Sequence, residues 1–303
     1  MAVGAYSSAM LTTTLGPKLG VSTAVLQWVL FPASLLLGGL VAALAGLAVG
    51  APSLRLKGDY LAIVTLGFGE IIRVFLNNLD NPVNITNGPK GLGQIDPLVV
   101  WGHPLSKPLD LGWLTLPSVT LYYYLFLVVV CLSVVMCHRL EQSRIGRAWI
   151  AIREDELAAQ AMGINTRNVK LLAFAMGASF GGIAGAMFAS FQGFVSPESF
   201  TLTESIAVLA MVVLGGIGHI PGVVLGAVLL AALPEVLRHT VEPMQMMMFG
   251  HVWIAAEVLR QLLYGLALVL IMLMRPSGLW PSPRHEDRLM PQELATTTVG
   301  GKA

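Results

Sequence analysis

The chain has 303 residues, of which 55% are hydrophobic and only 12% are charged. Its mean hydropathy of +0.73 excludes an ordinary soluble protein, because a soluble domain of this length cannot bury so much apolar surface. The formal net charge of +1 gives no case for nucleic acid as a partner. The composition therefore predicts an all-α polytopic protein, a bundle of helices that lies in a lipid bilayer.

The first residues, 1–11, are small and apolar and carry no basic flank. They resemble the interior of a longer helix, so we expect either that the natural chain continues upstream or that its start site is misassigned. The next apolar run, 22–50, is long enough to cross a bilayer. Arg55 and Lys57 follow it, and this basic bias places the short loop 51–58 on the cytoplasmic side.

The run 60–79 predicts a second span, although it contains glycines and two ionisable residues. Glu70 and Arg73 lie three residues apart, on one face of a helix. Inside a membrane such groups must be paired or lie in water. They therefore line a substrate path, or only tie two helices together, or lie in water if this run is displaced toward an interface. The candidate pathway residues of this run are Thr65, Gly67, Gly69, Glu70 and Arg73.

Residues 80–116 form a long loop rich in Asn, Gly and Pro, with balanced charge, which fits the external face. The run 117–138 then returns to the cytoplasmic side, and the run 171–191 crosses outward again. Small residues recur every fourth position along 171–191, which predicts a smooth stripe where a neighbouring helix packs closely. The stripe includes Gly177, Gly181 and Gly185.

Residues 139–170 are a polar island between two apolar runs, and their excess of basic residues places them on the cytoplasmic side. We call them the docking segment. Within it, the stretch from Asp155 to Met162 predicts a short helix, because acids crowd its first turn and Gly163 stands where a C-cap would. This helix is too apolar for a solvated loop and too short to span a bilayer, so it predicts a docking element.

The apolar runs 203–218 and 223–238 are both short for spans and meet at a Gly-Pro-rich turn. This pattern indicates broken or re-entrant helices that line a pathway. The candidate pathway residues of the turn are Gly215, Gly216 and Gly218. We expect an external loop at 239–250 and a last span at 251–274.

About seven membrane segments plus a partial N-terminal one result, in one permease domain over residues 1–280, with a disordered cytoplasmic tail at 281–303. The sequence offers no catalytic triad, paired carboxylates or metal-ligand spacing. Gly88 to Gly93 lacks the Gly-Lys-Ser/Thr of a phosphate-binding loop. We therefore expect no enzyme activity and no cofactor in this chain.

The pattern Ala158-Ala159-x-x-x-Gly163 resembles the coupling loop of bacterial ABC-importer permeases, with Leu157 at the position where that family usually has an acid. A more specific likeness lies in the stretches 54–73, 86–91 and 198–226. They resemble the M-type permease subunit of branched-chain (hydrophobic) amino-acid ABC importers. The resemblance reaches from residue 1 to about residue 280, and residues 1–11 resemble a family segment that normally follows an earlier span.

This resemblance implies a pore in the bacterial inner membrane, made of two related permeases. It also implies two cytoplasmic ABC ATPase subunits, which would bind ATP and Mg, and an extracytoplasmic substrate-binding protein. The docking helix would sit in an ATPase cleft, and ATP binding would move it. The residues to which the resemblance gives an ATPase-coupling role are Arg153, Glu156, Ala158, Ala159 and Gly163.

Three alternatives stay open from the sequence. A permease of the same family could carry urea or short amides. An ion-coupled secondary transporter could use Glu70 as a proton site, but it would need no docking segment. A membrane-bound structural subunit would show no dependence on a substrate.

Overall fold

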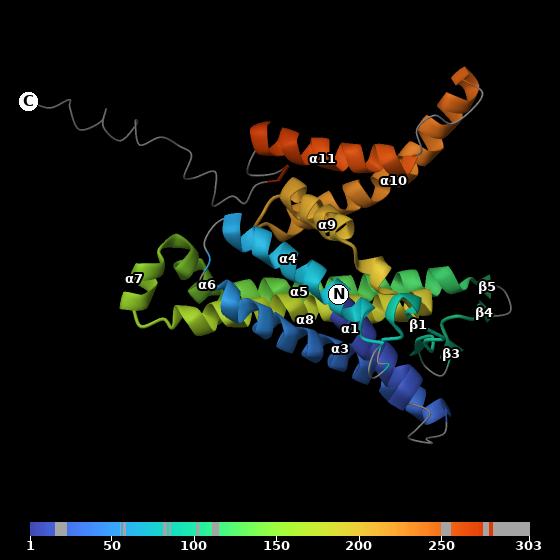
Figure 1. The fold of residues 1–303 in the computed structure, drawn as a ribbon, viewed down its shortest axis with the longest axis horizontal. Helices are drawn as coiled ribbons and strands as arrows, with labels where there is room; N and C mark the ends of the chain where they lie inside the picture. The colour runs from blue at the N-terminus through green and yellow to red at the C-terminus, as the bar shows by residue number, and fades with distance from the viewer. Residues whose placement is uncertain are drawn as a thin grey trace, which may run out of the picture. The chain divides into compact units, whose positions relative to one another are not determined.

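The structure is a computed structural model. It describes residues 1–15, 23–54, 56, 59–80, 84, 86–100, 103–110, 115–249, 256–274 and 279–280. The chain divides into two compact units, Met1–Leu202 and Thr203–Ala303, and each is described by itself. The described residues are mostly helical, as predicted (Figure 1). The predicted tail, 281–303, lies outside them.

The first unit contains seven α-helices among its described residues. In chain order they are α1 (Ala2–Met10), α3 (Thr23–Ser53), α4 (Asp59–Asn77), α5 (Ser118–Gln142), α6 (Arg144–Glu154), α7 (Glu156–Ala161) and α8 (Thr166–Gln192). A π-helical turn, η1 (Leu11–Leu15), follows α1, and single 3-10 turns form η2 (Gly88–Lys90) and η3 (Pro197–Phe200). Helix α4 is continuous, so Gly67 and Gly69 do not interrupt it.

Helices α1, α3 and α8 pack so closely that their backbones meet. A Cβ on Gly182 of α8 would collide with the carbonyl oxygen of Gly38 on α3, and a Cβ on Gly4 of α1 would collide with the backbone of Gly182. Ala5 and Ala9 of α1 are completely buried beside this contact. Small residues therefore bring three helices together, as expected where lipid provides no hydrophobic drive for association.

The loop between α4 and α5 contains short strands, which the all-α prediction missed. Strand β1 (Leu92–Gly93) pairs antiparallel with β6 (Phe194–Val195), with Leu92 opposite Val195. Two further antiparallel pairs join β2 (Val99–Val100) to β3 (His103–Pro104) and β4 (Leu109–Asp110) to β5 (Thr115–Leu116). Two-residue strands leave no periodic pattern in the sequence, because one alternation is not a period.

Among its described residues, the second unit contains α9 (Leu202–Gly215) except for its first residue, α10 (Ile220–Phe249) and α11 (Ala256–Met274). Its core joins Ala210 of α9, Leu230 of α10 and Tyr264 of α11, whose hydroxyl donates to the Leu230 carbonyl oxygen at 2.9 Å. Beyond α11, the backbone N–H groups of Leu279 and Trp280 donate to the carbonyl oxygens of Leu214 and Gly215 at the end of α9.

The helical bounds correct one sequence prediction. The second short run, 223–238, belongs to the 30-residue helix α10, which also covers 239–249, where an external loop was expected. The sequence prediction divided this region into a short apolar segment and a loop. In the structure the helix continues through Pro234 and Pro243, although proline usually disfavours the interior of a helix. The chain does leave helical geometry between α9 and α10, but a re-entrant path there stays a prediction.

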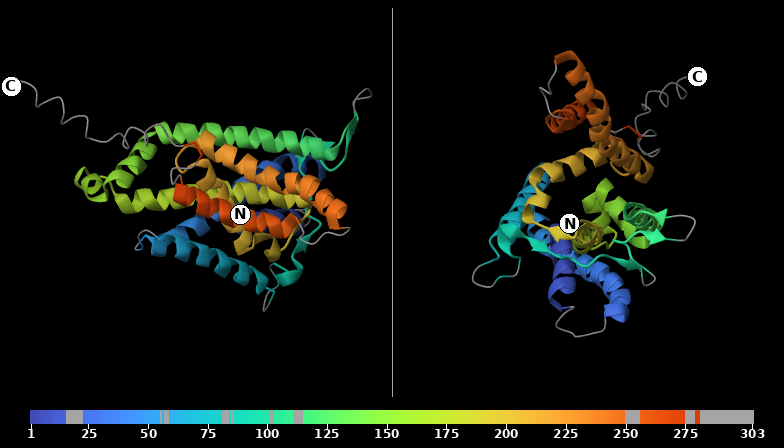
Figure 2. Two further views of the ribbon diagram at one scale, coloured as in Figure 1. Left: turned by 90° about the horizontal axis from the view of Figure 1, so that it is seen from above. Right: turned by 90° about the vertical axis from the view of Figure 1, so that its right-hand side faces the viewer.

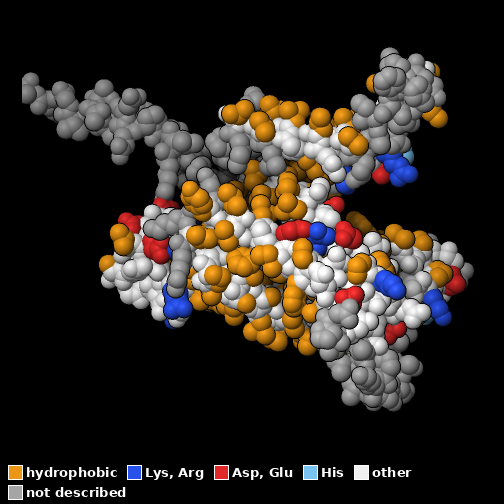
Figure 3. Space-filling model, in the orientation of Figure 1, with side chains coloured by type: hydrophobic (Ala, Val, Ile, Leu, Met, Phe, Trp, Pro, Cys, Tyr) orange, Lys and Arg blue, Asp and Glu red, His pale blue; other side chains and the backbone are white. Residues whose placement is uncertain are grey.

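Five stretches of the described helices are long and apolar enough to cross a membrane. They are Pro32–Ser53, Ser118–Gln142, Thr166–Gln192, Pro197–Gly215 and Ile220–Met247. Much of α5 is exposed, as in a helix that faces lipid or another subunit. Hydrophobic side chains are also spread over the face of the molecule shown in Figure 3. A multi-pass membrane protein is confirmed at this level, and the count of seven segments stays a prediction.

Candidate functional site

Helix α7 is a short helix with a well-formed beginning, at the position predicted for the docking helix. The Asp155 side chain is its N-cap, and Oδ1 accepts hydrogen bonds from the backbone N–H groups of Leu157 at 2.8 Å and Ala158 at 3.0 Å. Glu156 adds a negative charge in the first turn, which the helix dipole favours. An acid before an apolar stretch therefore fixes where this helix begins.

The end of α7 is a Schellman motif. Gly163 has φ +83°, its N–H donates to the Gln160 carbonyl oxygen at 2.9 Å, and the Ile164 N–H donates to the Ala159 carbonyl oxygen at 3.0 Å. This pattern satisfies carbonyls that a helix end otherwise leaves without partners. Glycine is favoured at position 163 because most side chains there would strain the backbone.

The surface of α7 is apolar and exposed. Leu157 is 76% exposed and Met162 is 83% exposed, and Ala158 and Gly163 are exposed as well. Ala159 is only 4% exposed, so of the two predicted alanines only Ala158 is available to a partner. Figures 1 and 2 show α7 at the far end of the docking segment, which joins α5 to α8. It lies beyond the ends of the long helices of this unit.

Three side chains anchor this turn to the beginning of α8. The Glu156 carboxylate pairs with the Lys170 ammonium at 2.6 Å. The Gln160 amide donates to the Thr166 hydroxyl at 3.0 Å, and the Trp149 indole N–H donates to the Val169 carbonyl oxygen at 2.8 Å. Sequence reasoning placed Glu156 and missed its partners, because contacts between separate helices follow no fixed spacing. The other predicted coupling residue, Arg153, lies exposed at the end of α6.

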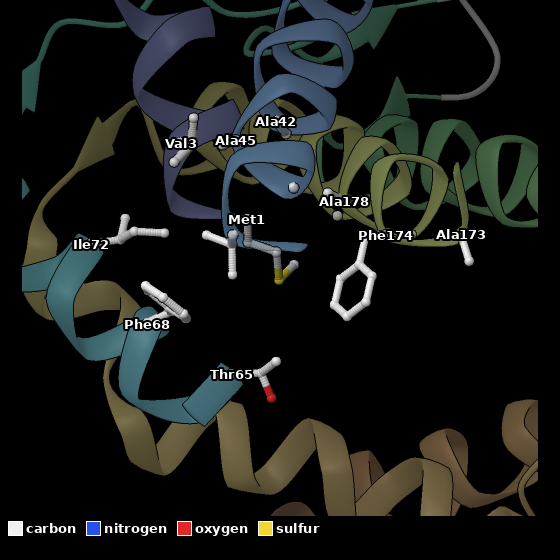
Figure 4. Close-up of a pocket in the computed structure, with 15 residues that line it drawn as sticks. Met1, Val3, Ala42, Ala45, Thr65, Phe68, Ile72, Ala173, Phe174 and Ala178 are labelled. Atoms are coloured by element: carbon white, nitrogen blue, oxygen red, sulfur yellow. The ribbon is translucent and has the colours of Figure 1, made fainter. Parts of the chain in front are cut away.

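The first unit also contains a cavity of about 600 Å³ between α3, α4 and α8, called here the α3–α4–α8 cavity. Its walls are almost entirely apolar, with Phe68 of α4 and Phe174 of α8 among the residues that line it (Figure 4). Thr65 and Gly69 of the predicted pathway line it as well. The Thr65 hydroxyl donates to the Leu61 carbonyl oxygen at 2.9 Å.

Glu70 and Arg73 do not line this cavity but form an ion-pair cluster. Arg73 Nε lies 2.9 Å from Glu70 Oε1, and Arg73 Nη1 lies 3.1 Å from Oε1 of Glu198 in η3. Arg73 therefore ties α4 to the turn that follows α8. Sequence reasoning gave Glu198 no role, because it is far from Arg73 along the chain. Gly67 lies on the exposed side of α4, with no atom within 4 Å of an added Cβ.

The predicted glycine stripe on α8 has two different environments. A Cβ on Gly185 would collide with the backbone of Met1, so this glycine lies in a tight helix contact. Gly177 and Gly181 line the α3–α4–α8 cavity instead, and an added Cβ on Gly177 would meet no atom within 4 Å. The closest approach to α3 occurs at Gly182, one position outside the stripe. A packing role for Gly177 and Gly181 stays a prediction.

The turn between α9 and α10 requires glycine at two positions. Gly216 has φ +112° and Gly218 has φ +89°, both in the left-handed region. Gly215 ends α9 and lies against the backbone of Gly222, where an added Cβ would collide. The His219 ring lies 5.8 Å from the Trp280 ring, measured between centroids. Within the described residues, no group of three His, Cys, Asp or Glu side chains could hold a metal ion.

Comparisons with known proteins place this arrangement in a family. Residues 1–272 match the model of the branched-chain amino acid transport system / permease component family. The chain is 42% identical over 300 residues to LivM, the high-affinity branched-chain amino acid transport system permease protein of Escherichia coli K12. That match covers 95% of this chain and 63% of LivM, so the chain spans somewhat less than two thirds of the length of this relative.

Two further relatives are more distant. The chain is 26% identical over 287 residues to the E. coli K12 permease protein LivH, which covers 94% of this chain and 84% of LivH. It is 30% identical over 208 residues to LsrC, an autoinducer 2 import permease of Yersinia enterocolitica, which covers 66% of this chain and 58% of LsrC. No solved structure matches the chain significantly. The five candidate membrane spans agree with the family match, and the chain belongs to the branched-chain amino acid transport permease family.

Proposed function

We propose that this chain is a transmembrane permease subunit of an ATP-driven importer for branched-chain, that is neutral hydrophobic, amino acids. We place it in the bacterial inner membrane. The 42% identity to LivM supports the substrate class, and the five candidate spans support a pore-forming subunit. The chain itself binds no nucleotide in this proposal.

The observation that carries the proposal is the exposed apolar surface of α7. Helix α7 has six residues, and Leu157 and its C-cap Met162 are exposed, so it is too short to span a bilayer and too apolar to remain in water. It fits a cleft in a protein partner. We assign this partner as a cytoplasmic ABC ATPase, of which two copies would bind ATP and Mg.

The remaining subunits follow from the relatives. Similarity to both LivM and LivH supports a second, related permease as the other half of the pore. An extracytoplasmic binding protein would deliver the amino acid. Transport would then be alternating access, in which ATP binding stabilises one of two pore conformations more than the other.

The α3–α4–α8 cavity is our candidate for part of the substrate path. Its volume of about 600 Å³ lies in the range of small-molecule sites, and its apolar walls suit an aliphatic side chain. Thr65 and Gly69 would line the path directly. The mutual pairing of Glu70 and Arg73 favours the alternative in which they tie two segments together.

Reconstitution tests this function. The complete complex is assembled in proteoliposomes from this permease, the related second permease, the ATPase and the binding protein. Uptake of radiolabelled leucine is measured with ATP inside the vesicles, where the ATPase side of the complex lies. We expect uptake that requires ATP and is competed by isoleucine and valine but not by urea. Leucine uptake driven by a proton gradient without the ATPase, or uptake of urea in place of leucine, would refute the proposal.

A further inference from the structure

The orientation of α7 depends on side chains rather than on helix continuity. Asp155, between α6 and α7, has φ −151° and ψ 114°, so extended backbone separates the two helices. On the other side, Gly163 breaks the helical path to α8 with its positive φ. A six-residue helix with a break at each end could pivot, and contacts with its neighbours must hold it.

The contacts that hold α7 and the end of α6 converge on the first turn of α8. Glu156 reaches Lys170, Gln160 reaches Thr166, and Trp149 reaches the Val169 carbonyl group. The Glu156 and Lys170 side chains are 36% and 31% exposed, so their ion pair is partly shielded from water. Thr166 is only 7% exposed, so its contact with Gln160 is largely buried.

Helix α8 leads from these contacts to the cavity. Its 27 residues form one continuous helix, which at 1.5 Å per residue is about 40 Å long. Ala173 and Phe174, one turn beyond Lys170, line the α3–α4–α8 cavity. Farther along, Gly182 and Gly185 meet the backbones of α3 and α1. If α7 is rigidly connected to Lys170, a displacement of α7 therefore moves α8 and, with it, one wall of the cavity.

We propose that Glu156 and Lys170 are a positioning pair, which makes α8 the helix that carries a displacement of α7 to the cavity. This inference rests on the proposed function, because a partner must move α7. Neither residue touches substrate. Without the ion pair, α7 loses one of the contacts that hold it and pivots more freely at Asp155 and Gly163, so that ATP hydrolysis continues while less of the motion reaches the cavity.

The test measures leucine uptake and ATP hydrolysis on the same proteoliposomes, which contain the complete complex. Glu156→Gln and Lys170→Met each remove the ion pair, and we expect uptake per ATP hydrolysed to fall about threefold, the effect of losing a partly exposed pair. In the Lys170→Met variant the ATPase should still copurify, and its rate should stay unchanged. The double variant Glu156→Lys with Lys170→Glu should restore uptake per ATP.

Arg167→Met is the matched control. It removes a positive charge from the same turn of α8, where Arg167 is exposed, and it should leave uptake per ATP unchanged. Full uptake per ATP in both single variants would overturn the proposal. So would a loss of ATPase copurification in Lys170→Met, because the pair would then serve docking rather than transmission, and so would failure of the reversed pair to restore coupling.

A second measurement separates this inference from the proposed function. Spin labels at Leu157 and Leu172, in a full-length chain with Cys131 and Cys137 replaced by alanine, report the distance between α7 and α8. The distance distribution should broaden in Glu156→Gln and narrow again in the reversed pair. An unchanged distribution overturns the positioning role, whatever the energy source. Absence of ATP-driven uptake in the unsubstituted complex instead refutes the proposed function.

Discussion

At position 163 a single backbone angle determines how α7 ends. Gly163 has φ +83° and no atom lies within 4 Å of an added Cβ, so the cost of a side chain is backbone strain alone. Gly163→Ala should destabilise the helix end by about 1–2 kcal/mol, and Gly163→Val by more. Amide hydrogen exchange at positions 163 and 164 should accelerate about five- to thirtyfold in the alanine variant. Gly163→Asn, which tolerates this conformation, is the control, and equal exchange in all variants would contradict the prediction.

The two neighbouring alanines of α7 should respond oppositely to the same change. Ala158→Glu adds a carboxylate on the exposed side, so the fold should be kept while copurification of the proposed ATPase partner is lost. Ala159→Glu forces a carboxylate into a site that is 4% exposed, at a cost of at least about 2 kcal/mol.

Limited trypsin digestion measures this difference. Cleavage within the docking segment should be much faster for Ala159→Glu than for the unsubstituted chain, and unchanged for Ala158→Glu. If Ala158→Glu retained full ATPase binding, the exposed surface of α7 would not be the contact.

At the scale of the helices, α8 offers a matched pair of glycines. Gly182→Ala places a Cβ 2.5 Å from the Ala42 Cβ and against the Gly38 carbonyl oxygen, so α3 and α8 must separate. We expect a loss of about 1–3 kcal/mol, as for other overpacked sites.

Gly177→Ala is the counterpart, because its Cβ enters open space. It should be neutral, or stabilise the helix by up to about 1 kcal/mol through helix propensity. The midpoint of thermal unfolding in detergent distinguishes the two variants. Equal midpoints would mean that α3 and α8 do not meet at Gly182.

At the scale of the whole molecule, the bounds of the helices do not determine on which side of the membrane each loop lies, so an experiment must decide it. Helix α4 has 19 residues and is about 28 Å long, close to the thickness of the hydrocarbon core, although it is not among the five candidate spans. We expect it to cross the membrane. Single cysteines replacing Lys57 and Leu157 should then react with an impermeant thiol reagent from the cytoplasmic side, and one replacing Lys107 only from outside.

Right-side-out and inside-out vesicles from the cysteine-free background give this answer. If cysteines at positions 57 and 107 react from the same side, α4 lies along an interface and does not cross. Glu70 and Arg73 would then be solvated, and they would have no place in a pathway.

The parts of this protein that the sequence could predict are the local ones. Asp155 and Gly163 place α7 because caps act within a turn, and the apolar runs place α5 and α8 because a span needs only length and composition. The partners of Glu156 and Arg73 could not be predicted, since they come from other helices. The stripe of small residues on α8 indicated that a neighbour packs there, but not that Gly182 makes the closest contact.

Through their hydrogen bonds, Leu279 and Trp280, the last described residues, cap the end of α9, a helix far upstream in the sequence. Those two N–H groups occupy carbonyls that the helix terminus would otherwise leave bare beside the glycine turn. Trimming the polypeptide after Met274 would look harmless on a hydropathy plot. It would nevertheless remove the cap of α9 and weaken the glycine turn between α9 and α10.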